Sequence, residues 1–252
     1  MTALAMSPTT ARPRRAVLRL HRPALIVWGA YVLLAVGALL WVHLFRAPSE
    51  RHPVDPYFVM TDVNNVMNFL GEVLSYTSVA VAAWAGAALV GRELENGAAR
   101  FAWSQSLTPA RWLTAQLGSA ALPLTAGTTL LGLVYAWVRT ADQDVLVTDW
   151  SYDRVLVPAG PMAVALVLFA LAVGALAGVA TGRALPALVV AAAGTYAARY
   201  FFGREWDTVW PVRRYWPVQL SATAVLLLLA ALALAAAYAL LGRRINIKGA
   251  AV

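Results

Sequence analysis

The sequence predicts an all-α polytopic membrane protein with six transmembrane helices. Of its 252 residues, 61% are hydrophobic and only 13% are charged, whereas a soluble domain usually carries about 25% charged residues. The apolar residues gather in six runs that are long enough to cross a bilayer, and the charged residues lie between these runs. We therefore expect the whole chain, residues 1–252, to form a single transmembrane domain.

The net charge of +8 is compatible with nucleic acid as a partner. The charged residues lie between apolar runs, however, where they serve to orient a protein in the bilayer. We therefore expect contact with membrane lipids and no nucleic-acid partner. The chain has no cysteine, which excludes disulfide bonds and thiolate chemistry. Its only lysine, Lys248, is not part of a P-loop sequence, so we do not expect nucleotide binding through that motif.

Residues 1–23, at the start of the chain, are polar and then basic. Arg15, Arg19 and Arg22 recur at the spacing of one helical face. This pattern predicts a short amphipathic helix that lies on the anionic inner leaflet. A basic tail that only sets the topology explains the pattern about equally well.

The six apolar runs define the expected membrane spans. We place them at residues 24–45, 73–91, 112–138, 162–181, 184–202 and 218–241. The third run contains Pro123, which predicts a kink. Before the second run, apolar residues recur at helical spacing in segment 46–71, as in an outward extension of the second helix. His43 lies near the outer end of the first span, where an interfacial side chain is a better interpretation than a ligand.

Small residues recur every four positions in the fourth span. Gly174, Gly178 and Gly182 form two overlapping GxxxG patterns, and such a face lets another helix approach closely. A contact within this chain and a contact between two chains both fit the pattern.

The distribution of positive charge predicts the topology. Six spans place both termini on one side of the membrane. With both termini in the cytoplasm, the inner segments carry the majority of the Lys and Arg residues, as the positive-inside rule requires. The expected location is therefore the cytoplasmic membrane, as a multi-pass protein.

The chain shows no arrangement of residues for catalysis or metal binding. Ion-coupled transporters usually place ionisable groups near the middle of the membrane, and spans one, three, four and six have none in their interiors. The outer loop after the third span is acidic, but its spacing does not match an EF-hand, and a solvated loop is the better interpretation; its acidic residues are Asp142, Asp144, Asp149 and Asp153. We expect no catalytic residue, no metal and no cofactor bound by this chain. If the protein transports a substrate, the energy comes from another protein.

Residues 92–112 form the longest polar segment on the inner side. The segment contains the only acidic residues of that side, Glu93 and Glu95. Thr108 followed by Pro109 predicts a cap and the first turn of a new helix. We therefore expect a helix, a break and a new helix along the membrane surface. Docking of a partner protein is the functional interpretation, and an interfacial loop without a partner is the alternative.

This segment resembles the signature of actinobacterial permease subunits of type-2 ABC exporters. The matching parts are RELENG at 92–97, RFAWSQS at 100–106 and RW at 111–112. The family pattern reads E-x-E-x-G-T, then A-W-T-Q-S, then R-W. The sequence departs from it at Ala98 and Ser104, where threonine is usual, and in the Pro-Ala pair before the last arginine.

The resemblance implies a permease subunit that is not itself an enzyme. A separate cytoplasmic P-loop ATPase would bind ATP and Mg²⁺ and drive export. The amphipathic N-terminus would be the elbow helix of the family, and the 92–112 loop would hold the coupling helix that enters a cleft of the ATPase. The residues implied in this coupling are Glu93, Glu95, Gly97, Arg100, Trp103, Gln105 and Arg111.

The resemblance also implies that two permease chains, identical or different, form the substrate pathway. Spans two and five would line it. Weak candidates for lining residues are Ser75, Tyr76, Thr195 and Tyr196, although packing is the favoured role for each. The alternative function is a membrane anchor that docks a cytoplasmic partner and transports nothing. The sequence does not identify a substrate.

Overall fold

The computed structural model describes residues 22–51, 56–104, 108–209 and 214–249. These residues form helices and connecting loops and contain no strand. Six of the helices are long and apolar enough to cross a membrane, which confirms the predicted all-α membrane fold with six spans. The amphipathic helix expected before residue 22 lies outside the described residues.

Several of the spanning helices are longer than the expected spans. The first begins as α2 (Arg22–Trp41) and continues through a π-helical turn, η1 (Val42–Arg46), into α3 (Ala47–Arg51). The second, α4, runs over Pro56–Glu95, so the outward helical extension is confirmed. The remaining elements are α5 (Ala98–Ser104), α6 (Pro109–Ala141), α7 (Asp153–Leu156), α8 (Pro161–Thr181), α9 (Ala184–Tyr200), η2 (Phe201–Glu205), α10 (Trp206–Val209) and α11 (Tyr215–Gly249).

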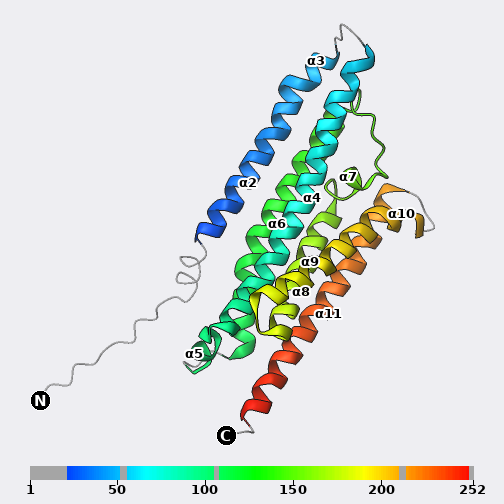
Figure 1. Cartoon of the computed structure of the whole chain (residues 1–252). Helices are drawn as coiled ribbons and strands as arrows, with labels where there is room; N and C mark the ends of the chain where they lie inside the picture. Colours follow the sequence, from blue (N-terminus) through cyan, green and yellow to red (C-terminus); the bar gives the residue numbers. More distant parts are fainter. Residues whose placement is uncertain (1–21, 52–55, 105–107, 210–213, 250–252) are drawn as a thin grey trace, which may run out of the picture.

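The long helices run lengthwise through an elongated bundle (Figure 1). The start of α2, the short helix α5 and the last turns of α11 lie at one end, here called the α5 end. The α3 and α10 helices, the start of α4 and α7 lie toward the opposite end, here called the α7 end. The two ends therefore carry different sets of short helices and loops.

The α8 helix is the most buried of the six spans. It begins at Pro161, a favourable first residue because proline has no N–H to leave unpaired. It ends at Gly182, whose φ of 66° lies in the left-handed region that glycine tolerates. Gly182 thus terminates the helix, whereas Gly174 and Gly178 lie in its packed face.

The face with these two glycines packs against α4 of the same chain. A Cβ atom on Gly174 would lie 2.6 Å from the backbone oxygen of Ala83, and one on Gly86 would lie 2.3 Å from the backbone oxygen of Leu171. A Cβ atom on Gly178 would lie 3.0 Å from the backbone nitrogen of Gly91. The two backbones therefore approach as closely as the small-residue pattern allows.

The first span packs against the third. The indole Nε1 of Trp28 donates a hydrogen bond to the carbonyl oxygen of Pro123 at 2.9 Å. Gly127 lies under the same ring, because a Cβ atom there would be 2.6 Å from the indole nitrogen. The α6 helix continues through Pro123 without ending there.

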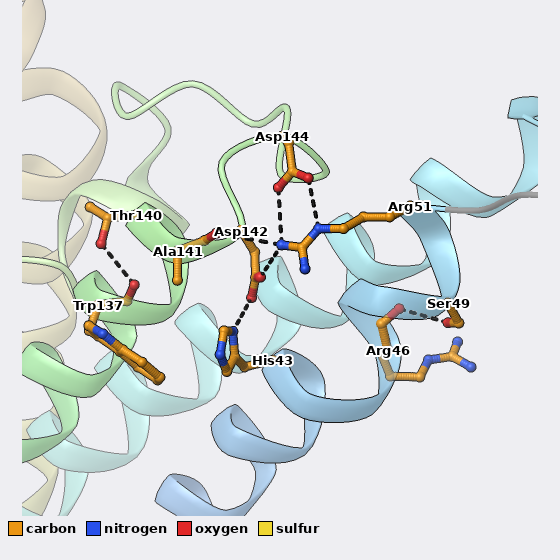
Figure 2. Close-up of polar contacts among 9 residues, drawn as sticks. All are labelled: His43, Arg46, Ser49, Arg51, Trp137, Thr140, Ala141, Asp142 and Asp144. Atoms are coloured by element: carbon orange, nitrogen blue, oxygen red, sulfur yellow. Dashed lines mark hydrogen bonds and ion pairs between the residues drawn. The ribbon is translucent and has the colours of Figure 1, made fainter.

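A cluster of charged residues joins the same two spans at the α7 end (Figure 2). Asp142, directly after α6, is fully buried. Its carboxylate contacts His43 Nδ1 at 2.9 Å and accepts from Arg51 at 2.7 Å. Arg51 also donates to Asp144 at 2.8 Å. The expectation of a solvated acidic loop is therefore wrong for Asp142, because the carboxylate is held between two partners from the first span.

Arg51 also affects the ionisation of Asp144. The hydrogen bond from the guanidinium lowers the pKa of this carboxyl below its ordinary value of 3.8. A carboxyl with a lowered pKa stabilises the folded state at pH values above its ordinary pKa, and the stabilisation is lost as the pH falls through the lowered value. The contact between Arg51 and Asp144 therefore weakens in acid.

We predict that Gly174→Ala destabilises the protein, because the added methyl group meets backbone atoms of α4. Overpacking of this kind costs about 1–3 kcal/mol, and the midpoint of thermal unfolding in detergent should fall by several degrees. Gly37→Ala is the matched control, because a Cβ atom at Gly37 has no neighbour within 4 Å. Equal midpoints for the two variants would contradict the close contact.

We also predict that Arg51→Gln makes the protein less stable near neutral pH and less sensitive to acid. The native chain should lose thermal stability between about pH 6 and about pH 3, partly because the Asp144 contact is lost. The variant lacks this contribution, so its melting temperature should fall less over the same range. Arg46→Gln is the control, since Arg46 pairs at 3.4 Å with the exposed Asp62 instead.

Candidate functional site

The connection between α4 and α6 forms the predicted partner-binding segment. The α4 helix ends at Glu95, and Gly97 has a φ of 75°. This left-handed conformation interrupts the first of the two helices expected in this segment, so that α5 is a separate short element. A Cβ atom on Gly97 would meet nothing within 4 Å, and the glycine is therefore needed for the turn and not for a close approach.

The start of α6 has the predicted cap. Thr108 has an extended backbone, and its hydroxyl accepts a hydrogen bond from the backbone nitrogen of Arg111 at 3.4 Å. Pro109 follows in the first turn, as expected. Gln105, which the sequence also places in the partner-binding segment, lies outside the described residues.

Glu93 holds the end of α4 against the start of α6. Its carboxylate accepts a hydrogen bond from the indole of Trp112 at 2.8 Å and another from the amide of Gln116. Trp103 on α5 packs edge-to-face on Trp112, with 5.7 Å between the ring centroids. Glu93 and Trp103 therefore hold the segment against the start of α6.

Glu95 reaches a different helix. Its carboxylate accepts a hydrogen bond from the backbone nitrogen of Ala184, the first residue of α9, at 3.1 Å. A negative charge is favourable at this position because the N-terminus of a helix carries a partial positive charge. Two carboxylates in the last turn of α4 thus contact two different spans, α6 and α9.

The exposed side chains of this segment include one aromatic ring and two arginines. Phe101 on α5 is 66% exposed. Arg92 and Arg111 are exposed, and neither forms an ion pair with another described residue. Arg100 lies on α5, but its side chain is outside the described part of the structure. The sequence did not indicate that Phe101 would face outward and Trp103 inward.

The four candidate pathway residues separate into two pairs. Ser75 and Thr195 are each 3% exposed, and Thr195 bonds to the backbone of its own helix. Tyr76 and Tyr196 face outward from the adjacent helices α4 and α9, and their rings stack with centroids 6.4 Å apart. The first pair packs inside the bundle, and the second pair forms a surface.

Sequence reasoning missed Arg199, which is 1% exposed in the last turn of α9. Its guanidinium donates to the hydroxyl of Ser75 at 3.2 and 3.4 Å and to the carboxylate of Asp153 at 3.5 Å. It also lies 4.6 Å from the centre of the Tyr76 ring. A signal was present, because Arg199 is the only charged residue in the expected fifth span.

Gly203 in η2 makes room for this arginine. A Cβ atom there would lie 2.3 Å from Nη1 of Arg199. The π-helical turn after α9 therefore places a residue without a side chain against the buried cation. Turns of this kind are frequent at functional sites.

The described residues offer no site for a metal. Among them, no group of three or more His, Cys, Asp or Glu residues is placed to hold an ion. The buried polar side chains among them are hydroxyls and amides, together with the charged Glu50, Asp142, Arg199 and Asp207.

Comparison with known proteins identifies the family. The family model described as ABC-2 membrane transporter related matches residues 55–205, from α4 to the end of η2. No curated protein and no solved structure matches the chain. The matched region is more than half of the chain and includes the α4–α6 connection and Arg199. The chain therefore belongs to the ABC-2 membrane transporter related family, whose members are membrane components of ABC transporters.

Proposed function

We propose that the chain is the permease subunit of an ATP-driven ABC exporter and that it couples to a separate cytoplasmic ATPase through residues 92–112. The observation that carries this proposal is how the side chains of that segment are placed. Glu93 and Glu95 attach the segment to α6 and α9, and the apolar side chain of Phe101 is exposed on its surface. ATP and Mg²⁺ then bind to the ATPase and not to this chain.

Charge supports a cytoplasmic position for the α5 end. Exposed arginines lie there at the end of α4, at the start of α6, in the turn between α8 and α9 and in the last turns of α11; they include Arg92, Arg111, Arg183 and Arg243. The start of α2 and the last turns of α11 lie at the same end (Figure 1). By the positive-inside rule, both termini are then cytoplasmic, in a protein of the cytoplasmic membrane.

We assign the apolar anchor of the docking contact to Phe101. The sequence resemblance implied Trp103, but the ring of that residue packs on Trp112. An exposed aromatic side chain on a short helix is suited to fill a pocket of a partner. Arg92 and Arg111 beside it favour a cleft with acidic residues on its rim.

We further propose that two permease chains, identical or different, form the pathway. The outward-facing Tyr76 and Tyr196 place aromatic surface on α4 and α9. Tyrosine combines an apolar ring with a polar hydroxyl, which suits a surface that meets both a substrate and a second chain. Ser75 and Thr195 serve packing in this arrangement.

We predict that Phe101→Ala releases the ATPase. Loss of a central aromatic anchor typically costs about 2 kcal/mol, which is about 30-fold in affinity. The measurement is the amount of P-loop ATPase that co-purifies with the tagged chain from native membranes in mild detergent. Thermal unfolding of the purified chain should be unchanged, because the side chain is exposed.

Phe69→Ala is the matched control, since Phe69 is 64% exposed on α4 but lies outside the docking segment. Equal ATPase recovery from the two variants would show that α5 is not the docking element. If the native chain retains no ATPase at all, the exporter proposal fails. A membrane anchor that docks another cytoplasmic protein then becomes the better interpretation.

A further inference from the structure

Charged residues join α4 and α9 at both ends of α9. The two helices run antiparallel, because α4 ends at the α5 end and α9 begins there (Figure 1). At that end, Glu95 of α4 accepts from the backbone nitrogen of Ala184 at 3.1 Å. At the other end of α9, Arg199 donates to Ser75 of α4 at 3.2 and 3.4 Å. Residues 184 and 199 are 15 positions apart, which separates the two contacts by about 22 Å along α9.

Close packing supports the same pairing between these two contacts. A Cβ atom on Gly91 would lie 2.9 Å from the Cα atom of Ala184, so the two backbones nearly touch at the α5 end. Farther along, Tyr76 of α4 stacks on Tyr196 of α9. The helices therefore contact each other along much of the length of α9.

The two contacts differ in strength. Arg199 is almost fully buried, and moving α9 away from α4 would leave a cation in an apolar environment without its hydroxyl partner. Glu95 is exposed, so water can replace the backbone nitrogen of Ala184 as its partner. The contact at the α7 end is thus the one that resists separation.

From this geometry we propose that Glu95 and Arg199 are positioning residues that make α4 and α9 move as one unit. The inference rests on the proposed function, because the force comes from an ATPase docked on α5. Displacement of the docking segment passes through Glu95 and α4 to α9. At the α7 end it reaches Asp153 of α7, whose carboxylate lies 3.5 Å from Arg199.

The first test measures the pairing in the purified chain alone. The natural sequence has no cysteine, so two introduced cysteines carry the only spin labels. The distance between labels at the exposed residues Phe69 of α4 and Leu185 of α9 reports the position of α9 relative to α4. In lipid nanodiscs we expect one narrow distance distribution for the native contacts.

Loss of either contact should broaden this distribution. The test variants are Glu95→Gln and Arg199→Gln, with Ser75→Ala as a milder change at the same contact in case Arg199→Gln does not fold. The matched controls are Glu72→Gln and Arg204→Gln, because Glu72 and Arg204 are exposed residues of the same spans outside the two contacts. A distribution that stays narrow in every folded variant would overturn the proposal.

The second test uses the complex with the ATPase and separates positioning from simple stabilisation. Labels at Leu44 in η1 and Val209 in α10 report movement at the α7 end. A non-hydrolysable ATP analogue should shift this distance in the native complex. In Glu95→Gln and in Arg199→Gln the shift should be lost, and in Arg199→Gln, which lies outside the docking segment, the ATPase should still bind the analogue.

Each failure has a different meaning. If Glu95→Gln releases the ATPase, Glu95 acts in docking and is not a positioning residue. If the shift persists in Glu95→Gln and in Arg199→Gln, the two helices do not transmit the movement through these contacts. If no ATPase binds the native chain, the proposed function fails, and the distances measured in the chain alone still decide whether α4 and α9 form one unit.

Discussion

The contact between the backbones of α4 and α8 is the constraint on which the rest of the structure depends. Gly86 and Gly174 lie so close together that a Cβ atom on either would strike backbone atoms of the other helix. This contact fixes α4 against α8, the most buried of the six spans. Because α4 also carries Ser75, Glu93 and Glu95, its position determines which spans these side chains reach. The position of the candidate docking segment therefore depends on the packing of α4 against α8 as well as on the contacts of Glu93 and Glu95.

The two ends of the bundle differ in the burial and the partners of their charged residues. At the α7 end, Asp142 and Arg199 are buried, and each is held by partners from another span. At the α5 end, Arg92 and Arg111 are exposed, and Glu95 is exposed although it contacts α9. Buried charges need fixed partners in an apolar environment, whereas exposed cations remain available to an acidic partner. The buried charges of the α7 end thus attach spans to one another, whereas the exposed charges of the α5 end fit the proposed contact with another protein.

The sequence was sufficient for features that depend on local composition. The six spans follow from apolar runs, and the cap at Thr108 follows from a threonine before a proline. The sequence was insufficient for contacts between segments that are distant in the chain. Asp142 appeared to belong to a solvated loop, because its partner Arg51 is 91 positions away. The inward position of Trp103 depends on Trp112 of the next helix. Arg199 was visible in the sequence, but its contact with Ser75 was not.

The unequal contacts at the two ends of α9 indicate where a change of shape begins. Separating α9 from α4 near Arg199 removes the Ser75 hydroxyl from a buried cation, whereas separating them near Ala184 only exchanges a protein partner of Glu95 for water. The contact near Ala184 is therefore the easier of the two to break. Glu93 and Glu95 leave α4 in the same turn but contact different helices, α6 and α9. In the proposed mechanism, a force on α5 would therefore act on two spans through neighbouring carboxylates, and the exposed contact of Glu95 would determine how much of it reaches α9.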